Sequence, residues 1–164
     1  MSVIGGEALT TVSTNPLHGL GETRYDSTTG KSYVFAQLSA SAANAAVLGT
    51  LLYGTIADPN IATDDVSATH RNLVLGFALG AIPLGSFAWL QTWGRGLVRK
   101  GRTTVVDVMA TGDLLVGNAT ADGVVQTMTA GTAPIYTPVA SCPNSADSAV
   151  SLLSADICIS RASS

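Results

Sequence analysis

The chain has 164 residues, of which 46% are hydrophobic, 5% aromatic and only 12% charged. This length suits one domain with a single core, and the charged share is about half of that in an average soluble protein. The net charge of −3 argues against a protein that binds duplex nucleic acid, because phosphate contacts require a basic face. A surface with so few charges is poorly protected against association. This composition favours a protein whose surface is covered by partners.

The sequence predicts an extended N-terminal arm at 1–23 and one β-rich domain at 24–164. Residues 1–23 carry scattered Gly, Thr and Ser without a sustained hydrophobic period, which is typical of a segment that is not a packed element. The arm has neither a basic stretch nor a long apolar stretch at its start, so no secretory signal is expected.

The domain is predicted to begin with a turn and a strand. The sequence DSTTG at 26–30 is a turn cluster, and KSYVFAQL at 31–38 has the alternation of a strand with Tyr33 and Phe35 on one face. A further strand is predicted over 48–55. The segment 57–70, with DPN and TDD, is predicted to be a polar loop.

A stretch without charged residues runs from position 72 to position 94 and has the hydropathy of a membrane span. Its pattern favours strands, because large and smaller residues alternate in LVLGFALG and again in FAWLQTW. The sequence IPLG between them supplies turn chemistry, so two strands joined by a short turn are predicted, with Leu75 and Phe77 on one face. A spanning helix stays open as an alternative, because Gly76 and Gly80 form a GxxxG pattern.

The remaining sequence predicts further short strands. They are expected at 105–109, at 114–116 and 124–128 as a hairpin around Asp122-Gly123, at 133–139 as an edge or irregular strand, and at 155–161. In total the pattern predicts a mainly β fold: a single small barrel or sandwich of about eight short strands with an extended N-terminal arm.

Groups that could perform catalysis are sparse. His18 and His70 lie in the arm and at the end of a polar loop, and neither accompanies a nucleophile motif such as GxSxG. Asp64-Asp65 could offer carboxylates to a hard cation, but the spacing is not that of an EF-hand. The sequence therefore predicts no enzyme, no cofactor and no metal site.

The two cysteines leave two alternatives open. Cys142 and Cys158 have neither CxxC spacing nor a nearby histidine, which argues against a metal or redox motif. A disulfide between them is one possibility, and two free thiols are the other, because two cysteines are too few to indicate a disulfide scaffold.

Two groups of residues are candidates for binding a partner. Half of the eight basic residues lie close together, at Arg95, Arg99, Lys100 and Arg102. On an acidic chain they predict a positive patch that steers the protein toward an acidic protein surface. The alternative is that these charges only keep a hairpin solvated. Trp89 and Trp93 are predicted to share a face of one strand, either as exposed stacking platforms or as core and interface residues.

Three stretches, ETRYDSTTGKSYVFAQL, RNLVLGFALGAIPLGSFAWLQTWGRG and TGDLLVGNATADGVVQTM, resemble a group of virion proteins from tailed phages and cyanophages. In that group an RYDS-x-TGK-x-Y opening precedes a G-x-ALGAIP-x-G-x-x-x-W-x-Q-x-W-G centre and a GD-x-L…ADG hairpin. The resemblance spans 22–128. It implies a capsid decoration, or cement, protein that is β-rich, generally trimeric and bound outside the shell near three-fold positions.

The expected function is therefore that of a structural virion protein of a bacteriophage. It would stabilise the viral capsid by binding the outer surface of the major capsid protein shell as a homotrimer, after synthesis in the host cytoplasm. No nucleic acid and no membrane partner is expected. The alternative is a carbohydrate- or receptor-binding β-module of a phage tail or fibre. Composition supports assembly independently, because a low-charge surface suits a large interface and an extended arm can add a strand to a neighbour.

Overall fold

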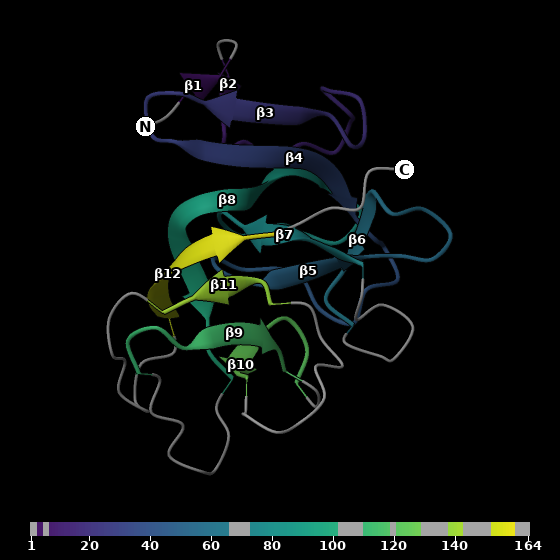
Figure 1. Ribbon diagram of the computed structural model, residues 1–164. Helices are drawn as coiled ribbons and strands as arrows, with labels where there is room; N and C mark the ends of the chain where they lie inside the picture. Colours follow the sequence, from purple (N-terminus) through teal and green to yellow (C-terminus); the bar gives the residue numbers. More distant parts are fainter. Residues whose placement is uncertain are drawn as a thin grey trace.

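The computed structural model describes residues 3–4, 7–65, 73–101, 110–118, 121–128, 138–142 and 152–159. Within these ranges every regular element is a β-strand, so the prediction of a mainly β fold is confirmed. Nowhere in these ranges is there a helix with the length and hydropathy that crossing a membrane requires. The described strands outnumber the predicted eight: one sheet contains ten strands, and β1 and β2 form a separate pair (Figure 1).

The strands are short except for β4 and β8. In chain order they are β1 (Val3–Ile4), β2 (Glu7–Ala8), β3 (Thr23–Asp26), β4 (Lys31–Leu38), β5 (Leu51–Gly54), β6 (Ile61–Thr63), β7 (Val74–Ala78), β8 (Phe87–Arg99), β9 (Leu114–Gly117), β10 (Val125–Thr127), β11 (Ala140–Ser141) and β12 (Leu152–Cys158). The predicted strands at 31–38, 48–55 and 155–161 correspond to β4, β5 and β12. The predicted hairpin is confirmed as the antiparallel pair β9 and β10.

Other predicted segments differ from the structure or lie outside the described residues. β6 lies inside 57–70, which was predicted to be a polar loop without a strand. The predicted strand at 105–109 lies outside the described residues, as does most of the one at 133–139. β11 is a two-residue strand that the sequence pattern does not reveal.

The uncharged stretch forms two antiparallel strands, β7 and β8, as predicted. A turn at Leu84 and Gly85 joins them, and Gly85 has a φ of 77°, which favours glycine. One prediction about this stretch is wrong. The pairing of β5 with β7 shifts by one residue between Leu52 and Tyr53, so Leu75 and Phe77 face different cores instead of sharing a face.

Five strands of the large sheet close into a ring of pairings. β8 pairs with β7 and also with β4, and β5 and β6 complete the circuit, with β4 and β6 parallel. The side chains that share one cluster inside this ring are small or aliphatic, and include Val34, Ala36, Leu38, Leu52, Ala62, Leu75, Ala88 and Leu90. A closed ring of few strands leaves little interior space, which explains why alanine serves as a core residue.

A second core lies between the ring and the later strands. Beyond Trp93, β8 leaves the ring and pairs with β12, and the sheet continues through β11 and β9 to β10. The buried residues of this core include Leu51, Tyr53, Phe77, Val98, Leu115, Val125, Leu153 and Ile157. β8 is 13 residues long and belongs to both cores, and Figure 1 shows it bending as it passes from one to the other.

The described part of the N-terminal segment packs on the sheet. Leu9 is buried in a third cluster with Tyr33, Phe35, Phe87 and Trp89. Ser13 and Phe87 exchange backbone hydrogen bonds of 3.0 and 2.7 Å. The ring of His18 lies 5.0 Å from that of Trp89, centroid to centroid. This part of the segment predicted as an arm therefore covers one face of β4 and β8.

Candidate functional site

The second half of β8 presents a different face from the first half. The pairing of β4 with β8 shifts by one residue between Ser32 and Tyr33, which leaves Thr92 as an extra residue in β8. An extra residue reverses the alternation of faces beyond it. As a result Trp89 is 3% exposed and Trp93 is 54% exposed, and the prediction that these two share a face is wrong.

Trp89 is a core residue. Its ring lies 5.1 Å from the ring of Phe35, and the guanidinium carbon of Arg24 lies 5.4 Å from its centroid. Nη2 of Arg24 is 2.7 Å from Oε1 of Glu22, and the hydrogen bond from Arg24 lowers the pKa of the Glu22 carboxyl. Trp89 is thus enclosed by packed groups and offers no surface to a ligand.

The two tryptophans should therefore respond differently to a soluble quencher. We expect iodide to quench the emission of Trp93 and to leave that of Trp89 largely unchanged, because contact quenching requires access to the ring. A Stern–Volmer titration of the wild type and of Trp93→Phe measures this difference. Strong quenching in Trp93→Phe would show that Trp89 is accessible and would contradict its burial.

Beyond the bend, alternate residues of β8 point outward. Gly94 has a φ of 86°, a value that favours glycine, where the strand bends. Val98 faces the second core, whereas Trp93, Arg95 and Leu97 are exposed and Arg99 is half-buried. The residues opposite these four on β12 are Cys158, Asp156, Ser154 and Leu152. We call these eight residues the β8–β12 face.

The β8–β12 face alternates apolar and cationic groups on β8. Nε of Arg95 donates a hydrogen bond of 3.1 Å to Oγ of Ser154, which orients the guanidinium across the two strands. Leu97 lies between the two arginines and is 41% exposed. Such a strip combines an apolar centre with guanidinium groups, which suit planar pairing with carboxylates.

Three of the four basic residues that were predicted to form one patch lie within the described part of the chain. Arg95 and Arg99 lie on the β8–β12 face. Lys100 is only 5% exposed, so it is not part of an exposed patch. Arg102 lies outside the described residues. Of the described basic residues in this segment, Arg95 and Arg99 therefore flank Leu97 on the β8–β12 face, and Lys100 is buried.

Apolar surface continues from Leu97 to the loop before β5. The backbone N–H of Arg99 donates to the carbonyl of Gly49 at 2.9 Å, which holds this loop beside β8. Leu48 in the loop is 38% exposed and lines a hollow of about 170 Å³ together with Leu79 and Leu97. Sequence reasoning missed Leu48 and Leu97, although the period-two pattern of positions 93, 95, 97 and 99 was a signal for the latter.

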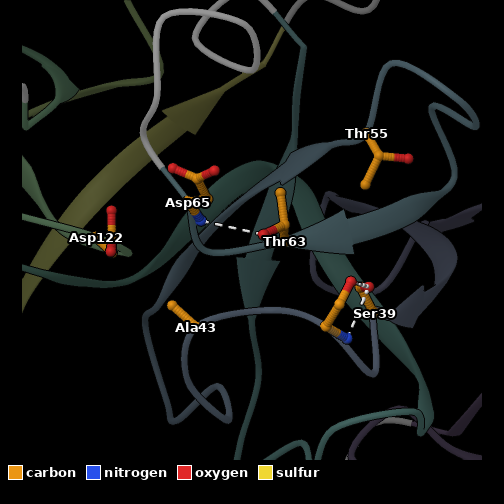
Figure 2. Close-up of a pocket in the computed structure, with 7 residues that line it drawn as sticks. Ser39, Ala43, Thr55, Thr63, Asp65 and Asp122 are labelled. Atoms are coloured by element: carbon orange, nitrogen blue, oxygen red, sulfur yellow. Dashed lines mark hydrogen bonds between the residues drawn. The ribbon is translucent and has the colours of Figure 1, made fainter.

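A polar pocket lies elsewhere on the molecule. It has a volume of about 370 Å³ and is lined by Ser39, Ser41, Ala43, Thr55, Thr63, Asp65 and Asp122 (Figure 2). Asp64 does not line it, because its carboxylate accepts hydrogen bonds from the backbone of Ala43 at 3.1 Å and from Nδ2 of Asn44 at 2.8 Å. Among the described residues, no three His, Cys, Asp or Glu side chains are grouped to hold a metal ion.

The histidines and the cysteines do not form a site together within the described part of the chain. His18 packs against the third cluster, and His70 lies outside the described residues. No disulfide joins Cys142 and Cys158, so of the two alternatives the disulfide is not formed. Burial, with a smaller contribution from Asp156, raises the pKa of the Cys158 thiol.

Comparison of the chain with protein-family models, with curated proteins and with solved structures finds no match. The β8–β12 face is where the predicted partner-binding residues Trp93, Arg95 and Arg99 come together.

Proposed function

We propose that this protein is a non-enzymatic structural virion protein that decorates a phage capsid. In this proposal it binds the outer surface of the major capsid protein shell as a homotrimer and stabilises the shell. The observation that carries the proposal is the β8–β12 face, in which exposed Trp93 and Leu97 alternate with Arg95 and Arg99. The likeness of three sequence stretches to phage decoration proteins supports the major capsid protein as the partner.

The composition of this face supports protein binding. Tryptophan and arginine are enriched among the residues that dominate interface energies, and charged groups at the rim steer the encounter. The face is also pre-organised, because its residues lie on a strand that makes seven consecutive residue pairs with β12. A rigid strand loses little conformational entropy on binding, so more of the contact energy appears as affinity.

Self-association is supported by a second set of residues. Large apolar side chains are exposed at other places on the described surface, including Leu17, Leu20, Leu114 and Met128, with exposed fractions from 36% to 52%. In a chain with only 12% charged residues, such a surface favours coverage by other copies. A trimer attached to a shell needs both kinds of contact, one between copies and one to the shell.

The test is a triple variant of the face, Arg95→Ser with Leu97→Ser and Arg99→Ser. We expect its affinity for preformed tailed-phage shells that lack decoration protein to fall at least about 100-fold, because interface anchors contribute about 2 kcal/mol or more each. The matched control is Leu84→Ser, which removes an apolar side chain of similar exposure in the turn before β8. Co-sedimentation with the shells measures attachment, and the thermal midpoint shows that both variants are folded.

Two results would contradict the proposal. A wild-type protein that is a stable monomer by sedimentation and never attaches to shells would exclude the function. Attachment of the triple variant at wild-type affinity would exclude the β8–β12 face as the binding surface.

A further inference from the structure

An open groove crosses three paired strands beside the β8–β12 face. Tyr25 on β3 pairs with Ser32 on β4, and Ser32 pairs with Trp93 on β8. Directly paired residues point to the same side of a sheet, so these three side chains form one row with the serine in the middle. Neighbouring strands lie about 4.8 Å apart, which places the two aromatic residues roughly 10 Å from each other.

Both aromatic residues are accessible in the described structure. Tyr25 is 65% exposed and Trp93 is 54% exposed. The groove has a volume of about 470 Å³, and its other lining residues are Thr23, Arg24, Tyr33, Thr92 and Ile159. This volume lies within the range of about 300–1,000 Å³ that is typical of small-molecule sites.

The lining carries little uncompensated charge. Arg24 contributes the only ionic group among the lining residues, and its guanidinium is paired with Glu22 at 2.7 Å. Burial raises the pKa of the Tyr33 hydroxyl, so that group stays neutral. A phosphate or carboxylate ligand would find no free cation in this lining, and the groove therefore does not fit an anion.

The same lining fits a ring that is apolar on its faces and polar at its edge. The rings of Tyr25 and Trp93 provide flat apolar surfaces, while the side chains of Thr23 and Ser32 provide hydroxyls that can donate and accept hydrogen bonds. We propose that this groove binds a neutral oligosaccharide, with sugar rings stacked on Tyr25 and Trp93. A decoration protein with such a site would also hold the particle at a glycan-covered surface.

This inference does not depend on the proposed attachment to a capsid. Trp93 belongs both to the groove and to the β8–β12 face, whereas Tyr25 lies on β3 and belongs only to the groove. Tyr25 is therefore the residue that separates the two ideas. If a Tyr25 variant lost saccharide binding but attached to shells normally, saccharide binding would be assigned to the groove and shell attachment to another surface.

The experiment uses the full chain and three neutral probes, maltohexaose, cellohexaose and chitohexaose, at millimolar concentration. We expect at least one to bind in a calorimetric titration and to change the emission of Trp93. Tyr25→Ser should weaken that binding about tenfold, because it removes one stacking surface. Tyr25→Phe should bind as the wild type does, since it keeps the ring, and Ile56→Ser is an exposed control outside the groove.

An anionic probe, the thymidine hexanucleotide, tests whether Tyr25 and Trp93 stack on sugar rings or on nucleic-acid bases. We expect the thymidine hexanucleotide not to bind, because the groove has no free cation for its phosphates. The triple variant of the β8–β12 face should still bind the saccharide. No binding of any of the three saccharides, binding that Tyr25→Ser leaves unchanged, or a preference for the thymidine hexanucleotide would each overturn the inference.

Discussion

Phe77→Ala is expected to lower the free energy of unfolding by about 4 kcal/mol. Phe77 is 1% exposed and lies in the second core with Leu51 of β5 and Val98 of β8. Its strand, β7, also lines the ring through Leu75, so the cavity left by alanine would open where the two cores meet. A urea titration measures the change, and the thermal midpoint should fall by on the order of 10 °C.

The control for this prediction lies in the turn that follows β7. Leu84 is 44% exposed, so Leu84→Ala should change the free energy of unfolding by no more than about 0.5 kcal/mol. Phe77→Leu should fall between the two, because it keeps most of the apolar volume. Equal effects of Phe77→Ala and Leu84→Ala would show that Phe77 does not hold the cores together.

Gly76→Val should destabilise the protein by on the order of 3 kcal/mol, whereas Gly80→Val should be tolerated. A Cβ atom at Gly76 would lie 2.7 Å from Cβ of Leu90 and 3.2 Å from the backbone oxygen of Gln91, so β8 would have to move. A Cβ atom at Gly80 meets no atom within 4 Å. Neither glycine has a positive φ, so the backbone does not exclude a side chain at either position.

The two glycines can be compared because they form the GxxxG of the uncharged stretch. Gly76 lies within β7 and against β8, whereas Gly80 lies in the bend after β7 with open space around it. Thermal and urea unfolding of the two valine variants measure the difference. If both variants were equally stable, the close approach of β7 and β8 at Gly76 would not be a constraint on the fold. If both were equally unstable, the GxxxG pattern would act as a unit.

Most strands were predictable because their signals are local. Alternation in β4 and β8, the turn residues at 26–30, and the Asp122-Gly123 turn each depend only on neighbouring residues. β6 was missed because its three residues follow a polar loop. It is a strand because β4 and β5 pair with it on either side, and no pattern within the segment reveals those partners.

The errors about faces have one common cause. A bulge is a mismatch in length between two paired strands, and the sequence of one strand does not contain it. The extra residues Leu75 and Thr92 each reverse the alternation, which separates Leu75 from Phe77 and Trp89 from Trp93. The candidate surface could therefore be predicted only in part.

The candidate residues illustrate the same limit. Arg95 and Arg99 were recognisable from the sequence as charges in a basic segment, and of the two Arg95 is exposed and Arg99 half-buried. Tyr25 lies in one row with Trp93 because β3 pairs with β4 and β4 pairs with β8. These pairings join strands that are far apart in the sequence, so the sequence pattern does not reveal this row. The burial of Lys100 also follows from tertiary structure, because an isolated lysine in a basic sequence is typical of the surface.

The length of β8 has a mechanical consequence. A force applied to the β8–β12 face along the strand direction would load seven consecutive residue pairs in shear, so their hydrogen bonds would have to break together. The same strand continues into the ring and is held there by β4 and β7. Tension at the outer face would thus pass through one continuous backbone into both cores, and the protein would resist being pulled apart at their junction.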